Sequence, residues 1–419
     1  MKVLVNCYAC GPHEGSEAGM GWNFVRVLAR IADLYVITES KFRPAIEQYY
    51  KAHPEEPAPA CFYYIRKSRY IPLACKVWPP SYYWLYRRWQ KKAYRLACGL
   101  EAKTHFDLVH QLNMVGYREP GYLWKLNIPF VWGPVGGFQI IPWRMLPSLG
   151  LYGCAFHAVR NLMNLFQMRT SRRVKAAMHK ACGLMASTQG NLGTMERLYH
   201  KENVLLCPEV GLEETTLGFV RSRIPGAKLK LCWSGVHVPR KALNLLLEAL
   251  RGGDLMEKTE LHVLGQGRET AHWKELARRY GLTNVVWHAW LARDEALCIM
   301  QDCDLFCITS LSDETSTVLL EALSLGLPVI APDLCGFTNV VDETCGLKIP
   351  VRTHGQFVHD YRQAIEAFLH DEPRRRLLAE GASRHAADFK WADKAQWVAS
   401  LYQGILISAR KSKPSILPG

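Results

Sequence analysis

The sequence has few acidic residues in its first half, and this shortage accounts for its whole net charge. Residues 1–210 carry 27 Lys and Arg against 13 Asp and Glu, whereas residues 211–419 carry 25 of each. The chain of 419 residues therefore has a formal charge of +14 that lies entirely in its first half. Such an excess invites a nucleic-acid interpretation. No nucleic-acid recognition motif accompanies it, so we predict no nucleic-acid partner.

Long apolar runs and low-complexity tracts are also missing. No stretch of about 18 uninterrupted apolar residues occurs, which argues against a membrane-spanning helix. The first apolar run, Val3 to Val5, is too short for a signal peptide, so we expect a buried strand there and a cytoplasmic protein. With 49% apolar residues the chain can bury a large core, and its length favours two globular domains.

The 14 cysteines do not form a disulfide or zinc pattern. Cys7 and Cys10 make a Cys-x-x-Cys, but they follow a strand pattern and lead into Gly11 and Pro12. A redox pair usually opens a helix, and a zinc site needs a second pair at suitable spacing. We therefore interpret them as small buried residues at a strand end, with a redox or metal role as the alternative.

The second half alternates short apolar runs with helical patterns, which is typical of a parallel sheet covered by helices. Ligands of such sheets bind at the carboxyl ends of the strands. The predicted strands are Leu229–Trp233, Leu261–Leu264, Val285–Trp287, Leu305–Ile308 and Pro328–Ala331, and the predicted helices lie near Lys241–Leu250, Ala271–Tyr280, Asp294–Met300 and Thr317–Leu325.

The first half begins with a similar pattern of strand, glycine-rich loop, helix and strand. These elements are expected at Val3–Asn6, Gly11–Gly21, Trp22–Arg30 and Leu34–Thr38, with later strands at Phe106–Val109 and Pro129–Trp132. We predict an N-terminal domain over 1–210 with a basic aromatic insertion at about 61–100, a linker over 211–227, a C-terminal domain over 228–385, and a returning C-terminal helix with a basic tail over 386–419.

Three loops contain residues suited to an anionic ligand. Residues 15–22 read GSEAGMGW, and Gly19 and Gly21 suggest that something approaches the backbone closely. After Gly235, the run WSGVHVPRK places Arg240 and Lys241 at a predicted helix start, where cations oppose the helix dipole unless an anion binds. A loop without ligand and solvated cations are the respective alternatives.

The third loop, SDETSTVLLEALSLGLPVIAP, is the most informative. A strand delivers Asp313 into it, Thr315 or Ser316 can cap the following helix, and Glu321 lies on an otherwise apolar face of that helix. A buried glutamate needs a partner, and two vicinal hydroxyls would suit its carboxylate. A solvent-facing Glu321 is the alternative.

One motif is interpreted as a decoy. Asp302-Cys303-Asp304 matches the Asp-x-Asp of metal-dependent sugar transferases, but it precedes a predicted strand and so lies at the wrong end of the sheet. We predict no metal held by the protein.

Together these motifs make the chain resemble the family-4 retaining glycosyltransferases. The resemblance implies an α/β GT-B fold, in which two Rossmann-like open parallel-sheet domains face a central cleft. The acidic pair Asp313-x7-Glu321 followed by Gly326-Leu327-Pro328 fits the family pattern, although the first position is usually glutamate. Val236 occupies the position of the family's usual arginine, which leaves Arg240 as its substitute.

The resemblance assigns roles to particular residues. Lys241 and Arg240 would clamp the donor diphosphate, and Asp313 would contact the donor sugar. Glu321 would bind the ribose hydroxyls, and the amides of Ser316, Thr317 and Val318 would meet phosphate or sugar. In the first half, GSEAGMGW would face the donor phosphates, and His110, followed along the chain by the GPVGG run 133–137, would lie near the transferred sugar.

The implied reaction is transfer of a sugar from a nucleotide-diphosphate donor, with retention and without a protein-bound metal. The acceptor would be a glycan or lipid-linked glycan of cell-surface polysaccharide or lipopolysaccharide synthesis. Two alternatives stay open. One is a catalytically inactive GT-B protein that binds sugar nucleotides or lipid, and the other is a sugar-nucleotide epimerase on the same scaffold.

The acid-free segment Cys61–Leu100 carries nine Lys and Arg among many aromatic residues. Its helical part suits an anionic membrane surface, which predicts a peripheral enzyme. The alternative is an aromatic face that packs on its own domain and a basic face in water. The residues assigned to this surface are Trp84, Arg87, Arg88, Trp89, Lys91 and Lys92.

Overall fold

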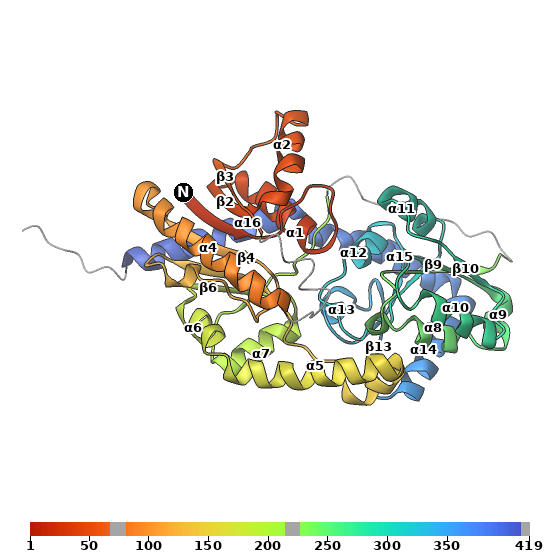
Figure 1. Cartoon of the computed structure of the whole chain (residues 1–419). Helices are drawn as coiled ribbons and strands as arrows, with labels where there is room; N and C mark the ends of the chain where they lie inside the picture. Colours follow the sequence, from red (N-terminus) through yellow and green to blue (C-terminus); the bar gives the residue numbers. More distant parts are fainter. Residues whose placement is uncertain (68–80, 214–226, 412–419) are drawn as a thin grey trace, which may run out of the picture. The chain divides into compact units, whose positions relative to one another are not determined.

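The protein forms two compact units in a computed structural model that describes residues 1–67, 81–213 and 227–411 (Figure 1). Unit 1 contains Met1–Phe138, Gln167–Glu209 and Trp391–Gly419, and unit 2 contains Gln139–Phe166 and Val210–Lys390. Each unit is built on an open sheet in which every described strand pair is parallel. This confirms the predicted α/β class with two parallel-sheet domains.

The sheet of unit 1 has the strand order β3-β2-β1-β4-β5-β6-β7. The order reverses between β1 and β4, so their carboxyl ends form the switch point at which such sheets commonly bind ligands. The strands are β1 (Lys2–Cys7), β2 (Asp33–Glu39), β3 (Cys61–Ile65), β4 (Leu108–Asn113), β5 (Phe130–Val135), β6 (Gly183–Ala186) and β7 (Leu205–Leu206). The helices are α1 (Ser16–Ala29), α2 (Arg43–Ala52), α4 (Ser81–Thr104), α6 (Arg172–Lys180), α7 (Gln189–Tyr199) and α16 (Trp391–Lys411), with short 3₁₀ turns η1 (Ser40–Phe42) and η2 (Leu123–Lys125).

The sheet of unit 2 repeats this plan in the order β10-β9-β8-β11-β12-β13, with its switch point between β8 and β11. The strands are β8 (Leu229–Ser234), β9 (Thr259–Leu264), β10 (Val285–Trp287), β11 (Leu305–Cys307), β12 (Val329–Pro332) and β13 (Gly346–Ile349). The helices are α5 (Gly150–Thr170), which continues into unit 1, α8 (Leu243–Ala249), α9 (Asp254–Lys258), α10 (Thr270–Arg279), α11 (Arg293–Gln301), α12 (Thr317–Ser324), α13 (Phe337–Val340), α14 (His354–His370) and α15 (Glu372–Ala386), with 3₁₀ turns η3 (Trp143–Leu149), η5 (Pro239–Lys241) and η6 (Ala387–Phe389).

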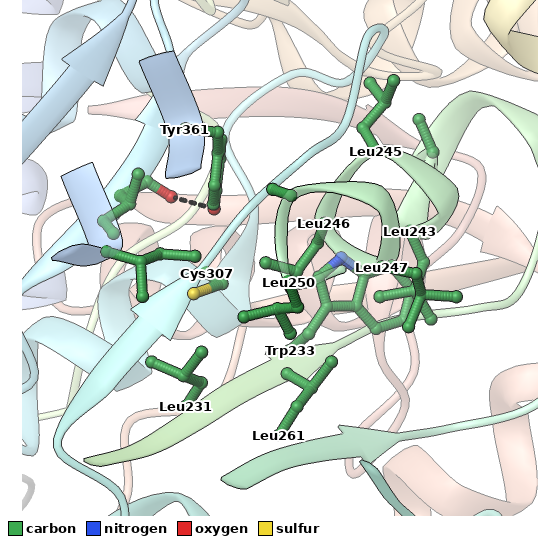
Figure 2. Packing of buried hydrophobic residues seen from close by; sticks show 14 of the residues in the cluster. Leu231, Trp233, Leu243, Leu245, Leu246, Leu247, Leu250, Leu261, Cys307 and Tyr361 are labelled. Carbon is green, nitrogen blue, oxygen red and sulfur yellow. Dashed lines mark hydrogen bonds between the residues drawn. The ribbon is translucent and has the colours of Figure 1, made fainter. Parts of the chain in front are cut away.

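The core of unit 2 explains why its strands and helices could be predicted from apolar runs in the sequence. Leucines of α8 pack against Leu231 and Trp233 of β8 and Leu261 of β9, and all of these side chains are buried (Figure 2). The hydroxyl of Tyr361 of α14 lies within hydrogen-bond distance of two carbonyl oxygens, that of Ile308 at 3.2 Å and that of Ile330 at 3.0 Å. The predicted strands and helices of this half agree with the structure within about two residues.

The segment Gln139–Phe166 belongs to unit 2, whereas the sequence analysis placed it in the N-terminal domain. Its η3 turn contributes Met145 and Leu149 to the unit 2 core. Asn244 of α8 also donates to the carbonyl oxygen of Ser148 at 2.9 Å. Packing partners far along the chain, which no local pattern reveals, thus decide where this segment belongs.

The ends of the predicted linker and of the C-terminal segment also differ. Residues 214–226 of the linker and 412–419 of the tail lie outside the described residues. The predicted C-terminal segment starts at residue 386, but α15 and η6 lie in unit 2, and only α16 from Trp391 onward lies in unit 1, against α1. Within unit 2, the backbone amide of Leu212 donates to the carbonyl oxygen of Phe389 at 2.9 Å.

Part of the segment 61–100, which was predicted to be an insertion, belongs to the sheet of unit 1. Cys61–Ile65 is strand β3, which pairs with β2 at the sheet edge, and the helix α4 begins at Ser81. Residues 68–80 lie outside the described part. In the described ranges, no helix is both long enough and apolar enough to cross a bilayer.

Candidate functional site

A cluster of charged side chains lies at the switch point of the unit 2 sheet. Lys241 and Arg240 follow β8, and Asp313 follows β11, so loops after neighbouring parallel strands bring them to one edge. The Lys241 ammonium lies 2.6 Å from Oδ2 of Asp313, and the Arg240 guanidinium lies 3.5 Å from Oδ1. Arg240 and Lys241 are therefore in contact with Asp313, which lies more than 70 positions further along the chain.

The two cations are presented by a 3₁₀ turn and not by the first turn of an α-helix as predicted. Turn η5 ends at Lys241, Ala242 adopts a left-handed conformation with φ of 47°, and α8 begins only at Leu243. Arg240 also donates to the carbonyl oxygen of Ser312 at 2.6 Å. The turn thus directs both cations toward the loop after β11.

The charge of Asp313 is fixed by these neighbours. Its burial alone would raise the pKa, but the nearby positive charges of Lys241 and Arg240 outweigh burial, and the pKa is lowered. Asp313 is therefore an anion at neutral pH. The three side chains carry two positive charges and one negative charge, so the cluster keeps a net attraction for an added anion.

A hydrogen-bond chain holds the Lys241 turn in place. The indole N–H of Trp233 donates to Oγ1 of Thr309 at 3.0 Å, and the Thr309 hydroxyl donates to the carbonyl oxygen of Lys241 at 2.8 Å. The amide of Leu311 donates to the carbonyl oxygen of Arg240 at 2.8 Å. Buried, satisfied contacts of this kind preorganise a site.

Glu321 lies in α12 and is buried, as its apolar surroundings predict. Burial raises its pKa, although Arg293 of α11 opposes this by donating from Nε to Oε1 at 2.7 Å. The guanidinium of Arg293 is 62% exposed, so it covers the carboxylate from the solvent side. Sequence reasoning missed Arg293 as the partner of Glu321, because Arg293 lies on a different helix, 28 positions earlier in the chain.

The other residues of unit 2 predicted to contact the donor follow β8 or begin α12. Ser316 is the N-cap of α12, and Thr317 and Val318 form its first turn, where backbone amides lack intrahelical acceptors. Gly235 directly follows β8, and a Cβ there would lie 3.6 Å from Cε of Lys241. Val318 packs against the core cluster that includes Leu319 and Leu320, and contact of Ser316, Thr317 and Val318 with a donor stays a prediction.

Sequence reasoning also missed the loop after β9. Gly265 has a φ of +104°, and a Cβ there would lie 2.3 Å from the carbonyl oxygen of Gly235. A Cβ at Gly267 would lie similarly close to the carbonyl oxygen of His237, at 2.5 Å. The signal was present, since GQG directly follows a predicted strand, and only glycine permits such close backbone contact.

The glycine-rich segment of unit 1 is a helix rather than the predicted loop. The helix α1 begins at Ser16, so Gly19 and Gly21 are helical. A Cβ at Gly21 would lie 2.1 Å from the carbonyl oxygen of Ala9 and 2.6 Å from Sγ of Cys7, and a Cβ at Gly19 would lie 2.1 Å from the carbonyl oxygen of Glu14. The object that approaches these glycines is the chain itself, which accounts for them without a ligand.

His110 has partners within the chain, and its predicted contact with the transferred sugar stays a prediction. It lies on β4, is fully buried, and uses both ring nitrogens, with Nδ1 2.6 Å from the Tyr402 hydroxyl and Nε2 2.7 Å from the carbonyl oxygen of Gly133. Burial lowers its pKa to about 4, so the ring is neutral at pH 7. His110 therefore joins β4, β5 and α16, and its side chain has no free nitrogen for a sugar in this structure.

The helix α4 divides the predicted membrane residues into two groups. Trp89 is buried and donates its indole N–H to the carbonyl oxygen of Ile65 at 3.1 Å, so it is not a surface residue. Arg87 pairs with Glu119 at 2.8 Å. The exposed side of the helix lines a hollow of about 380 Å³, formed by Trp84, Arg87, Arg88, Lys91, Lys92 and Arg95. The aromatic face thus packs on its own domain, and the basic face is in water.

The two motifs interpreted as unrelated to chemistry have structural partners. The carboxylate of Asp304 accepts from the amide of Lys230 at 2.8 Å, at the amino end of β8, which is the predicted wrong end of the sheet. Cys7 and Cys10 are buried free thiols, and burial raises the pKa of Cys7 well above its usual value. A raised thiol pKa opposes redox and metal chemistry at neutral pH.

Comparisons with known proteins find a family match and structures of similar fold. The family model described as "Glycosyl transferases group 1" matches residues 218–385, which include every member of the charged cluster. The D-inositol 3-phosphate glycosyltransferase of Stackebrandtia nassauensis is 30% identical over 210 residues, which is 47% of this chain and 46% of that protein. The chain thus matches less than half the length of this curated relative.

Two solved structures share the fold over nearly the whole chain. The Anabaena protein HepE in complex with UDP has a TM-score of 0.64 at 16% identity, covering 96% of this chain and all of that one. The lipopolysaccharide outer core galactosyltransferase WaaB in its apo form also has a TM-score of 0.64, at 14% identity and with the same coverage. Such identities establish the GT-B fold, and the family match adds support for a glycosyltransferase.

Proposed function

We propose that this protein is a retaining glycosyltransferase of family 4. It moves a sugar from a nucleotide-diphosphate donor to a glycan or lipid-linked acceptor in cell-surface polysaccharide or lipopolysaccharide synthesis, at the cytoplasmic side of a membrane. The observation that carries the proposal is the Lys241–Asp313–Arg240 cluster at the switch point of the unit 2 sheet. The names of the S. nassauensis relative and of WaaB, and the UDP bound to HepE, are consistent with it.

The chemistry needs stabilisation of a departing diphosphate more than it needs a nucleophile. Cleavage of the bond between the anomeric carbon and the phosphate oxygen leaves negative charge on the diphosphate, beside the Lys241 ammonium and the Arg240 guanidinium. The acceptor hydroxyl forms the new bond on the same face, and its proton passes to the departing phosphate oxygen. Asp313 orients Lys241 through the 2.6 Å contact, and it contacts the donor sugar.

Glu321 is suited to the nucleoside end of the donor. A buried carboxylate held on one side by Arg293 retains a second oxygen that can accept from ribose hydroxyls. The Lys241 and Glu321 side chains come from one unit, so a donor bound along this edge would use both. We expect the reaction to proceed without a metal held by the protein, which activity in the presence of EDTA would test.

The deciding experiment combines binding and turnover. Purified protein is heated with UDP-, GDP- and ADP-sugars in a thermal-shift panel, since a ligand at about 100 times its dissociation constant adds about 2.7 kcal/mol of stability. The stabilising donor is then followed for release of the nucleoside diphosphate. Stabilisation with release supports a transferase, and no stabilisation by any donor contradicts the proposal.

Two outcomes of the same experiment would favour the alternatives. Stabilisation without release, with or without acceptor, indicates an inactive sugar-nucleotide binding protein, for which the aspartate at 313 and the valine at 236 would be the structural basis. Conversion of the donor sugar to its epimer, with the nucleotide bond intact, indicates an epimerase. Product analysis by NMR separates both from transfer and also reports the anomeric configuration.

A further inference from the structure

The helix α5 has its apolar and polar faces in the reverse of the usual arrangement. Soluble proteins usually turn the apolar stripe of a helix inward. On α5 the exposed side is apolar over four turns, and its large side chains are 49–95% exposed. They are Leu151, Tyr152, Phe156, Val159, Leu162, Met163 and Phe166.

The buried side of α5 is polar, and its side chains have structural roles. Asn161 accepts from the amide of Ile141 at 3.3 Å and donates to its carbonyl oxygen at 2.8 Å. His157 is also buried, and burial lowers its pKa to about 4, so it is neutral there. The polar face thus stabilises the irregular backbone before η3, and this fixes the apolar face outward.

A patch of this size needs an explanation, because single exposed apolar residues are common but contiguous stripes mark interaction sites. The helix has 21 residues, but it does not combine the length and the apolar character that crossing a bilayer requires. A helix with a large apolar face and a cationic border is typical of elements that lie in the plane of a membrane interface.

The charge around α5 favours a lipid surface over a protein partner. Residues 139–166, the part of unit 2 that includes most of α5, contain Arg144 and Arg160 and not one Asp or Glu. Arg144 lies exposed just before the helix, next to Trp143, which is 45% exposed. Tryptophan and arginine are residues that anchor a segment at the headgroup level, and a segment without acidic residues avoids repulsion from anionic lipids.

We propose that the outward face of α5 inserts into the interface of an anionic membrane and holds the protein there. The insertion uses apolar contact by Leu151, Val159 and Leu162, whereas Arg144 beside Trp143 supplies electrostatic attraction. The inference deepens the proposed function, on which it rests for the membrane-linked acceptor. It differs from the sequence-based interpretation, which assigned the aromatic residues of α4 to the membrane.

The test is flotation of the full chain with vesicles of phosphatidylcholine, with and without phosphatidylglycerol. We expect the wild type to bind both kinds of vesicle, and the anionic kind more tightly. The double variant Val159→Asp/Leu162→Asp should bind both at least about tenfold more weakly, because each substitution removes an inserted apolar side chain. Leu377→Asp on α15, at a leucine that is 62% exposed, is the matched control and should bind like the wild type.

A second variant separates apolar insertion from charge. Arg144→Gln, just before α5, should reduce the advantage of anionic vesicles and keep the binding to neutral ones. Wild-type protein that binds neither vesicle, or an α5 variant that binds like the wild type, would overturn the proposal. A wild-type dimer in sedimentation that the α5 variant converts to monomer, without vesicle binding, would overturn it in favour of a second copy as the partner.

The outcome is independent of whether the transferase proposal holds. The α5 substitutions change exposed side chains that no described hydrogen bond or ion pair joins to the charged cluster, so release of nucleoside diphosphate in water should be the same in the α5 variant and the wild type. Vesicle binding through α5 without any donor turnover would support the membrane surface and contradict the transferase. Turnover without vesicle binding would do the reverse.

Discussion

The carboxyl edges of the two sheets follow the same strand order and are filled in opposite ways. In unit 2 the loops after β8 and β11 present Lys241 and Asp313 as a partly exposed charged pair. In unit 1 the loops after β1 and β4 are tied to each other, with Asn113 donating to the carbonyl oxygen of Ala9 at 2.7 Å and Glu17 accepting from the amide of Val115 at 2.7 Å.

The difference teaches that architecture alone does not locate a site. A switch point offers a place where loops diverge, but side chains decide whether that place is open and charged or packed by the protein itself. The resemblance to a glycosyltransferase family assigned ligand contacts to both edges. The structure supports charged contacts at the unit 2 edge and gives the unit 1 residues structural partners. Four substitutions would break or sharpen this contrast.

The largest effect is expected at the charged cluster. Lys241→Ala should lower donor turnover by roughly 10²–10³-fold, because a preorganised cation beside developing charge is lost. The melting temperature should change little, since Arg240 still faces Asp313. Lys274→Ala, an exposed lysine of the same unit, is the control. Full turnover in Lys241→Ala would remove the unit 2 edge as the site.

A stability effect is expected at the unit 1 edge. Gly21→Ala should lower the free energy of unfolding by about 1–3 kcal/mol, because the added methyl group would overlap the Ala9 carbonyl oxygen. Gly15→Ala is the matched change, since a Cβ there has nothing within 4 Å, and it should cost less than about 1 kcal/mol. Urea titration measures both. Equal effects at the two glycines would contradict the packing explanation.

A moderate effect is expected at Glu321. Glu321→Gln should weaken donor binding about tenfold, since hydrogen bonds to a charged group contribute about 1.5–3 kcal/mol. The change should raise the KM for the donor more than it lowers kcat. Arg293→Gln should have a smaller effect in the same direction, because it only positions the carboxylate. A larger loss in Arg293→Gln than in Glu321→Gln would show that Arg293 itself contacts the donor.

The smallest effect is expected at His110. Its pKa falls from about 6.5 in the unfolded chain to about 4 in the fold, so the neutral ring stabilises above pH 6.5 and this contribution is lost as pH falls. When the pH falls from 6.5 to 5.5, the free energy of unfolding should therefore decrease by about 1 kcal/mol less in His110→Gln than in the wild type. Donor turnover at pH 7.5 should stay within about threefold. A hundredfold loss of turnover with unchanged stability would restore the sugar-binding role.

Local patterns predicted the elements well where the core is regular. The strands and helices around Trp233 and Leu261 were legible because parallel strands covered on both faces are apolar throughout and alternate with helices. The same reasoning predicted that Glu321 is buried and needs a partner. It failed to place Gly19 and Gly21 inside a helix, because a glycine required by close packing inside a helix looks the same in sequence as a glycine in a ligand-binding loop.

Long-range partners were outside the reach of sequence reasoning. Trp89 and Trp84 share one basic aromatic helix, yet one is buried and the other exposed, and only the packing of α4 on β3 distinguishes them. The contact of His110 with Tyr402, 292 positions away, could not be read from the sequence either. The partner of Glu321 likewise lies on a different helix.

The sequence by itself determined the two parallel-sheet domains, the location of the charge excess, and the loops that carry Lys241, Asp313 and Glu321. Each of these follows from residue type and spacing along a short stretch. Only the tertiary structure decided which of those side chains meet, which glycines are filled by the chain, and that α5 turns its apolar face outward. The direction of a helix face depends on what the rest of the chain places against it, and no periodicity within the helix contains that information.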